Sequence, residues 1–442
     1  MLRRLRGHAG ARAAGANAVW LVLDRLVGLA VSIVITAALV RYLGPAGFGL
    51  WTYALAIVGL LAPFAQMGID AVAVRELVEE PDAREEIVGT TLVVLLGCGA
   101  LLVPIAAGVA VVAGHGDHRS IVLIAVLSLQ FVLQATLAID FWFRAVLQSK
   151  YTVWSTKAAL VVSSAVTLLL IAFRAPVTAF AATVLLEAAV SSALLIRAFQ
   201  STGARLSALR FRAARAKQLL RAGLPFLAGI FAGSVYTKID FVILRELAGM
   251  AEVGIYSAAV RISELWIFVP MALATSLFPT VVRMRESVHA KRRMQQLYDL
   301  TALGALAVVL PTILLARPLI VLIFGREFAA AAPMLAVHIW TLFLISIGLM
   351  RNNWLVAENL GYAYMAAAIA GAVVNVALDL VLIPRYGGLG AAWASVAAQA
   401  VIVYGSMLFF PRAWPALRQM LLAIAAPVRL LFAAISGRGI DR

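Results

Sequence analysis

Long apolar stretches dominate the chain, and short clusters of glycine, proline and charged residues separate them. Such clusters mark turns, and the stretches between them have the length of a helix that crosses a bilayer, about 20 residues. Runs such as 92–112 lack the apolar–polar alternation of a transmembrane β-strand. The pattern predicts an all-α integral membrane protein with about twelve transmembrane helices, at residues 17–40, 47–69, 88–113, 120–143, 153–173, 177–198, 223–247, 253–281, 299–324, 332–356, 362–383 and 388–410.

The composition excludes a soluble globular protein. Apolar residues make up 63% of the 442 residues and charged residues 13%, and the mean hydropathy is +0.98, whereas soluble domains are about 45–50% apolar and about 25% charged. Twelve spans use about 240 residues, so no sizeable extramembrane domain fits. Cys98 is the single cysteine, which excludes an intramolecular disulfide and a multi-cysteine metal site.

The basic residues predict the orientation. Lysine and arginine number 37 against 21 acidic residues, and the excess gathers in the N-terminal tail, in the loop 199–222 and around 283–293. All three segments fall on one side of a twelve-span protein. Basic loops stay cytoplasmic, so both termini are expected in the cytoplasm. Without a recognisable nucleic-acid-binding module, the charge is not taken as a sign of nucleic-acid binding.

A weak internal repeat divides the chain. A shift of 210 positions places Ala181–Ala182 on Ala391–Ala392, and a shift near 205 places the segment 43–54 on 247–259. An even number of spans separates the copies, so the repeat is parallel and predicts two six-helix lobes, as in many transporters. The predicted organisation is a basic N-terminus (1–16), an N-terminal lobe (17–198), a basic linker (199–222), a C-terminal lobe (223–410) and a tail (411–442).

The tail holds one more apolar segment, at 417–435. Arg418, Pro427 and Arg429 interrupt it, and arginines are costly in hydrocarbon. An interfacial helix is therefore expected there in preference to a thirteenth span.

Ionisable residues inside the predicted spans are the candidates for function, because such residues are expensive in a membrane. They gather in the first helices of each lobe, and polar residues accompany them in the later spans. The candidates for substrate binding are Arg25, Lys238, Arg261, Asn352 and Asn353, and those for ion coupling or charge balance are Asp24, Asp240, Glu264, Glu187 and Asp379.

Spacing leaves two interpretations open for several of these residues. Arg261 and Glu264 are three apart, and Asp140 and Arg144 are four apart, so each pair either neutralises itself on one helix face or serves a ligand. Adjacent residues on a helix do not face each other, so Arg25 beside Asp24 needs a partner on another helix, a ligand, or the membrane interface. Glu187 and Asp379 are either proton carriers or protonated, hydrogen-bonded carboxyls.

The signatures of common enzymes and of nucleotide-driven pumps are absent from the sequence. It contains no GxxxxGK[ST], HExxH or GxSxG motif, and its five histidines take no metal-ligand spacing. The chain is therefore predicted to be no enzyme, to hold no cofactor or metal, and to couple transport, if at all, to protons or sodium ions.

Three segments in order resemble one transporter family. The first is RYLGPAGFG at 41–49, followed by a helix that ends MGIDAVAVRE. The second joins Lys238 and Asp240 to VGIYSAAVRI at 253–262 and to LFP at 277–279, and the third is PRYGGLGAA at 384–392. Together they resemble the bacterial polysaccharide-unit flippases of the Wzx type, within the multidrug/oligosaccharidyl-lipid/polysaccharide (MOP) exporter superfamily.

The resemblance implies a MATE-like fold and a flippase in the bacterial inner membrane that carries undecaprenyl-pyrophosphate-linked oligosaccharides by alternating access for surface polysaccharide biosynthesis. Membrane lipid, a polysaccharide polymerase and glycosyltransferases are the implied partners. Arg25 matches a cavity arginine of the related lipid II flippases, but Val31 stands where a second arginine is expected. We hypothesise that Lys238 supplies the second cation for the pyrophosphate, while asparagines bind sugar hydroxyls.

Other functions compete with this one. A multidrug or cation exporter of the same superfamily would need an acidic or aromatic cavity, whereas Arg25, Lys238 and Arg261 favour an anion. A membrane glycan polymerase or ligase would need a large outer loop, and the predicted outer loops are short. A scaffold that recruits other glycan enzymes without transport is the third alternative.

Overall fold

The computed structural model describes residues 2–114, 116–274, 290–357, 361–408, 410, 413–427 and 429; side chains are described throughout these ranges except at 2–27, 29–31, 290, 353, 356, 357, 361–364 and 406. The chain is helical, and eleven of its described stretches are long and apolar enough to cross a membrane. The first of them, Ser32–Glu79, is 48 residues long and includes parts of two predicted spans. The predicted all-α membrane fold is confirmed.

The N-terminal lobe contains the first six predicted spans. Its helices are α1 (Leu2–Gln66), α2 (Asp70–Glu79), η1 (Pro81–Ala83), α3 (Arg84–Gly114), α4 (His118–Ser128), α5 (Gln130–Leu133), η2 (Gln134–Thr136), α6 (Leu137–Ala145), α7 (Lys150–Ala172), η3 (Val177–Phe180) and α8 (Ala181–Ser201).

The C-terminal lobe follows a short connection that includes η4 (Leu206–Ala208). Its described helices are α9 (Ala213–Ala248), α10 (Met250–Leu265), α12 (Ala290–Leu314), α13 (Ala316–Phe324), η5 (Arg326–Phe328), α14 (Ala331–His338), α15 (Trp340–Ala357), α16 (Gly361–Tyr386), α17 (Gly388–Ala400), the π-helical η6 (Val401–Gly405), α18 (Ser406–Leu408) and α19 (Trp414–Ile424).

Two glycines make the corresponding turns of the two lobes. Gly44 interrupts α1 with φ 63° and ψ 179°, and Gly249 separates α9 from α10 with φ 90° and ψ 171°. A positive φ combined with an extended ψ is a conformation available essentially to glycine. The two turns are 205 residues apart, as the sequence repeat predicts.

The lobes cross beside these turns in a reciprocal contact. A Cβ on Gly49 would lie 1.8 Å from the carbonyl oxygen of Met250, and one on Gly254 would lie 1.9 Å from that of Pro45. Adding 205 to Gly49 and Pro45 gives Gly254 and Met250, so each lobe presents the same surface to the other. This pseudo-symmetric crossing of α1 and α10 confirms the two pseudo-repeated lobes.

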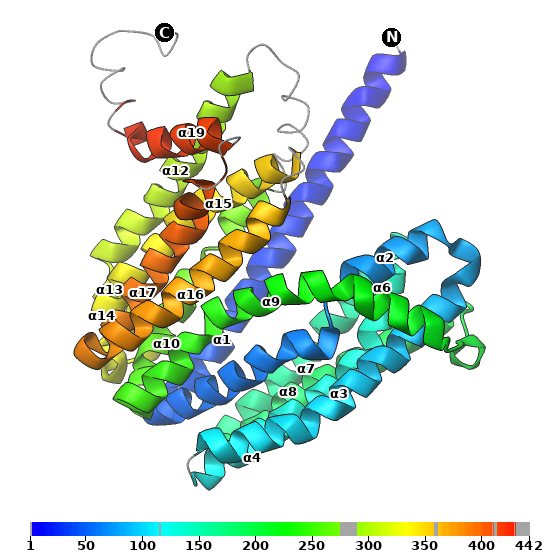
Figure 1. Cartoon of the computed structure of the whole chain (residues 1–442), viewed down its shortest axis with the longest axis horizontal. Coiled ribbons are helices and arrows are strands. Elements are labelled where there is room, and N and C mark those ends of the chain that lie inside the picture. Colours follow the sequence, from blue (N-terminus) through cyan, green and yellow to red (C-terminus); the bar gives the residue numbers. More distant parts are fainter. Residues whose placement is uncertain are drawn as a thin grey trace.

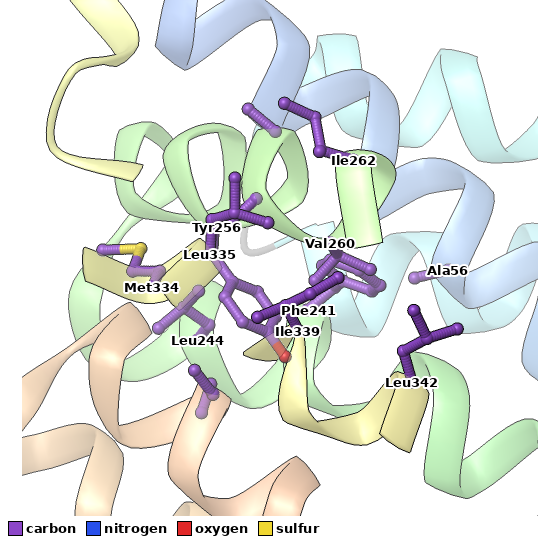
Figure 2. Packing of buried hydrophobic residues seen from close by; sticks show 14 of the residues in the cluster. Ala56, Phe241, Leu244, Tyr256, Val260, Ile262, Met334, Leu335, Ile339 and Leu342 are labelled. Atoms are coloured by element: carbon purple, nitrogen blue, oxygen red, sulfur yellow. The ribbon is translucent and has the colours of Figure 1, made fainter. Parts of the chain in front are cut away.

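The two lobes meet at one end of the bundle and diverge toward the other (Figure 1). They meet at the Gly44 and Gly249 turns, which we call the turn end. The start of α1 and the helix α19 lie at the other end, which we call the basic end because the predicted basic segments belong there. The apolar core is continuous across the lobes: Figure 2 shows Ala56 of α1 near Phe241 of α9, Val260 of α10 and Leu342 of α15.

Ion pairs hold the start of α9 against the N-terminal lobe. The predicted linker 199–222 is too long at its C-terminal end, because its last ten residues are part of this helix. Arg215 donates to Glu76 at 3.2 Å, to Glu80 at 2.7 Å and to Glu86 at 3.0 Å, and its side chain is only 10% exposed. The hydrogen bond from Arg215 also lowers the pKa of Glu80. The helix α9 begins at Ala213 and packs on α2 and α3, and these carboxylates offset part of the charge of the basic segment.

Replacing Arg215 with alanine is expected to destabilise the fold by about 3–5 kcal/mol, the usual effect of breaking a buried ion pair. The Glu76 side chain, 5% exposed, would lose its cationic partner. Thermal unfolding of the purified protein in detergent measures the change. Arg212→Ala is the matched control, because Arg212 is 64% exposed at its 3.5 Å contact with Glu86 and should change stability by about 0–1 kcal/mol. Equal effects of the two variants would contradict the prediction.

The tail forms the helix α19, which lies across the basic end of the bundle (Figure 1). It packs against α12, and Gln419 donates to the carbonyl of Lys291 at 2.7 Å. Met420 is buried, whereas Trp414 and Leu421 are exposed. Of the predicted interfacial segment 417–435 the structure describes 417–427 and 429, and its place at the membrane interface stays a prediction.

Candidate functional site

A cavity of about 310 Å³ lies between the two lobes. Ser32 and Thr36 of α1 line its N-terminal-lobe side, and Arg261 and Glu264 of α10 line the other, with α13 closing it. The remaining wall is apolar, built from Ile33, Leu265, Ile267, Phe268, Met271, Ile323 and Phe324. The sequence candidates Arg261 and Glu264 therefore share one inter-lobe cavity.

Arg261 is the one basic residue among those that line this cavity. Its side chain is exposed, and within the described side chains it forms no ion pair with Glu264, so the self-neutralised pair allowed by the i,i+3 spacing is not formed. The planar fork of the guanidinium suits phosphate oxygens, and the neighbouring Glu264 is the one acidic residue among those that line this cavity.

A second cavity of about 70 Å³ adjoins the first, since Glu264 and Ile267 line both. It contains the buried carboxylate of Asp240, whose Oδ2 accepts hydrogen bonds from Tyr256 Oη at 2.9 Å and from Ser395 Oγ at 2.8 Å. With its side-chain amide oriented so that the nitrogen faces Asp240, Asn375 donates a hydrogen bond to Asp240 Oδ1 at 2.9 Å. Helices α9, α10, α16 and α17 each supply one group.

Asp379 is the second carboxyl of this cluster. It lies within hydrogen-bonding reach of Asp240, its exposure is 0%, and unless the two carboxyls share a proton its oxygens meet no hydrogen-bond donor among the described residues. Two adjacent buried carboxylates without a cationic partner are very costly. A shared proton or a small cation bound by these oxygens relieves that cost, so the cluster of Asp240, Asn375, Asp379, Tyr256 and Ser395 is a candidate cation or proton site, which we call the carboxyl cluster.

Two other acidic candidates of the N-terminal lobe have local partners. Arg144 Nε lies 3.1 Å from Asp140 Oδ2, which confirms the i,i+4 pair, and Thr152 donates to the same carboxylate at 2.7 Å. Ser163 Oγ donates to Glu187 Oε2 at 2.9 Å. Neither carboxylate lines the inter-lobe cavity.

The structure separates the remaining candidates from the cavity or does not describe them. The Lys238 side chain packs against α1 at Gly59, with its Cγ 3.5 Å from the position of a Cβ there, and it is not among the residues that line the cavity. Asp24 and Arg25 lie on α1, but their side chains, like that of Asn353, are outside the described part. Their roles stay predictions.

Asn352 is held inside the C-terminal lobe by a buried arginine. Arg351 Nη2 donates to Asn352 Oδ1 at 2.7 Å, and Arg351 Nη1 donates to the carbonyls of Ile402 and of Val403 in η6. Side-chain donors that enter a helical hydrogen-bond ladder commonly accompany such a local distortion. The contact ties α15 to η6, whereas sugar binding by Asn352 stays a prediction.

Reciprocal arginines close the turn end of the lobes. Arg41, at the end of the first half of α1, donates to the carbonyls of Leu322 and of Ile323 in α13. Arg245, near the end of α9, donates to the carbonyl of Gly114 at 3.3 Å. Each lobe thus caps the third span of the other with an arginine from its own first span, and cations at helix C-termini are favourable.

Sequence reasoning missed Lys157 and the hydroxyl donors of the carboxyl cluster. Lys157 of α7 points at α1, with its Nζ 2.7 Å from the position of a Cβ on Gly28. Lys157 lies about one turn inside the predicted span 153–173, and an ionisable residue there is a signal that sequence alone contains. Tyr256 and Ser395 carry no such signal, because neither is charged and 139 residues separate them.

Comparisons with known proteins agree with this architecture. Residues 14–285 match the family model described as polysaccharide biosynthesis protein. A Shigella flexneri protein named as an O-antigen transporter is 24% identical over 85% of this chain and 92% of its own length. A Haloferax volcanii protein named as a low-salt glycan biosynthesis flippase is 24% identical, but that match spans only 36% of the relative's length.

Solved structures share the fold. The inward closed conformation of the lipid II flippase MurJ superposes with a TM-score of 0.69 at 13% identity, over 96% of this chain and 93% of that chain. An inward-facing MATE multidrug transporter of the MOP superfamily superposes with a TM-score of 0.68 at 18% identity, over 88% of this chain and 96% of that chain. The expected MATE-like fold is confirmed.

Proposed function

Because the chain belongs to the polysaccharide biosynthesis protein family, we propose that this multi-pass membrane protein is a flippase for lipid-linked polysaccharide units. Its proposed substrate is an undecaprenyl-pyrophosphate-linked oligosaccharide, moved from the cytoplasmic to the outer leaflet of a bacterial inner membrane for surface polysaccharide biosynthesis. The observation that carries this proposal is the inter-lobe cavity, in which Arg261 shares a largely apolar wall with Glu264, Ser32 and Thr36.

The cavity suits the chemistry of such a headgroup. A diphosphate cannot cross about 30 Å of hydrocarbon without fixed cations, and Arg261 offers two parallel donors to phosphate oxygens. Ser32 and Thr36 add hydroxyls for polar atoms of the substrate. The apolar remainder of the wall is compatible with the first part of a lipid tail, while the rest of the tail stays in the bilayer.

Alternating access in this proposal is a rocking of one lobe against the other. The turn end is closed by the Gly49–Gly254 crossing and by the arginine caps of Arg41 and Arg245. Opening that end toward the outer leaflet requires these contacts to break. The same contacts therefore set the balance between the two orientations of the lobes.

The carboxyl cluster is the proposed coupling site, for a proton or a sodium ion. It lies in the C-terminal lobe and adjoins the substrate cavity through Glu264. An ion that neutralises Asp240 and Asp379 would change the packing of α9, α10, α16 and α17 around the cavity wall. Neither catalysis nor a bound cofactor enters this proposal.

Arg261→Gln is expected to reduce flipping of an undecaprenyl-pyrophosphate-linked oligosaccharide at least ten-fold, because a charge-assisted hydrogen bond contributes about 1.5–3 kcal/mol. The measurement is leaflet exchange of a fluorescent substrate in proteoliposomes. Arg326→Gln is the matched control, since Arg326 is exposed and does not line the cavity. Wild-type export of organic cations with no glycan flipping would favour the multidrug exporter instead, and full activity of a well-inserted Arg261→Gln would remove Arg261 from the site.

A further inference from the structure

The last predicted span, 388–410, is not a regular α-helix. Its first half is α17, and the residues Val401–Gly405 that follow form the π-helical η6. A π turn inserts one extra residue into a helix, and such turns are frequent at functional sites. Within a membrane, neighbouring side chains must satisfy the backbone groups that the distortion frees.

Arg351 of α15 supplies donors to this π turn. Its side chain is 1% exposed, and its Nη1 donates to two successive carbonyls of η6, those of Ile402 and of Val403. Gly348 of the same helix leaves room for the turn, because a Cβ there would lie 3.0 Å from Val403 Cγ2. An arginine inside a membrane span is costly and marks a functional role by default, and here its donors are directed at one distorted turn.

The π turn packs closely on α16. A Cβ on Gly371 of α16 would lie 2.1 Å from Ile402 Cγ1 and 3.5 Å from the carbonyl oxygen of Ala398, so a side chain at residue 371 does not fit beside Ile402. The helices α15, α16 and α17 pack against one another (Figure 1). The contact between Ile402 and Gly371 therefore fixes how closely the last span approaches α16.

The carboxyl cluster begins one turn away on the same face of α16. Gly371, Asn375 and Asp379 follow one another at intervals of four residues, so they share one side of the helix. The step from Gly371 to Asn375 is about 6 Å. Ser395, the group that α17 supplies to the cluster, precedes Ile402 by about two turns. The spacing of the two helices is thus set next to the place where the cluster is assembled.

We propose that Arg351 is a positioning residue for the carboxyl cluster, because it holds the π turn that seats Ile402 on Gly371 and so sets the distance between α16 and α17. This inference rests on the proposed coupling role of the cluster. The hydrogen bond from Ser395 to Asp240 is 2.8 Å long, and such a bond weakens steeply when its geometry is disturbed. Releasing η6 from α16 weakens binding of the coupling ion, as loss of the groups that orient a set of ligands does.

The test measures the ion concentration that gives half-maximal stimulation of flipping. Leaflet exchange of an undecaprenyl-pyrophosphate-linked oligosaccharide is followed in proteoliposomes, in a sodium titration at fixed pH and in a pH titration without sodium. Arg351→Met should raise this concentration about ten-fold or more for the ion that stimulates the wild type, with near wild-type flipping at saturating ion. Arg351→Lys, which keeps donors but loses the planar fork, should fall between the two.

Gly371→Ala tests the same contact with the arginine intact, and it carries the test if Arg351→Met does not fold. Its methyl group would displace Ile402, so it should raise the half-maximal concentration as Arg351→Met does. Adding Ile402→Ala removes the obstructing atoms and should restore the wild-type value. Gly233→Ala is the matched control, because a Cβ on Gly233 of α9 has no atom within 4 Å.

Wild-type ion dependence in Gly371→Ala would overturn the proposal. So would an Arg351→Met protein whose flipping falls equally at every ion concentration, because that is the result of a structural role alone. Wild-type flipping that responds neither to sodium nor to pH would overturn the coupling role of the carboxyl cluster, and this inference with it, while leaving the proposed substrate in place. Absence of wild-type flipping would overturn the proposed function itself.

Discussion

Gly254→Ala is expected to reduce flipping at least ten-fold and to destabilise the protein by about 3 kcal/mol or more, at or above the upper end of the usual range for overpacking. The new methyl group would lie 1.9 Å from the backbone oxygen of Pro45. A backbone atom cannot rotate away, so α1 and α10 must separate where the lobes meet. Flipping in proteoliposomes and thermal unfolding in detergent measure the two effects.

Gly49→Ala should have the same effect, because the crossing is reciprocal. The double variant should be less than additive, since both substitutions force apart the same pair of helices. Gly304→Ala is the matched control: a Cβ on Gly304 of α12 has no atom within 4 Å, and helix propensity favours alanine there. Normal activity and stability of Gly254→Ala would show that the lobes do not need this contact.

Asp379→Asn is expected to abolish the dependence of transport on an ion gradient while leaving downhill flipping in place. Asparagine resembles a protonated aspartate in shape and removes a fully buried carboxylate that lies beside Asp240. Thermal stability should therefore stay unchanged or rise, since an unneutralised buried charge is costly. The measurement is flipping with a sodium gradient, with a pH gradient and with neither, for wild type and variant.

Glu187→Gln is the matched control for that experiment. Glu187 is another acidic residue of a membrane-spanning helix, and its carboxylate accepts a hydrogen bond from Ser163. Both residues belong to the N-terminal lobe, whereas the carboxyl cluster belongs to the C-terminal lobe. Its gradient dependence should equal that of the wild type. Unchanged coupling together with lower stability in Asp379→Asn would assign the carboxyl cluster a structural role.

Sequence patterns predicted the helices well because the bilayer imposes a length and an apolar composition on each span. The Gly44 and Gly249 turns could also be predicted, since the shift near 205 aligns them. The reciprocal fit of Gly49 on Met250 and of Gly254 on Pro45 could not, because it depends on how the two lobes dock. The periodicity of a sequence indicates which residues share a helix face, but it does not indicate how closely two helices approach each other.

Candidate residues could be selected one by one from the sequence, but their grouping in space could not. Arg261 and Glu264 were candidates from their cost in a membrane, and the structure places both in one cavity. Asp240 and Asp379 were separate candidates 139 residues apart, and only packing of α9 against α16 brings them together. Lys157 was missed because a lone lysine near the end of a span resembles one that snorkels to the interface.

The most direct test of the proposed function is leaflet exchange of an undecaprenyl-pyrophosphate-linked oligosaccharide by the wild-type protein in proteoliposomes, measured beside export of an organic cation by the same vesicles. The proposal predicts glycan flipping well above that of protein-free vesicles, and no cation export. Cation export without glycan flipping would contradict it.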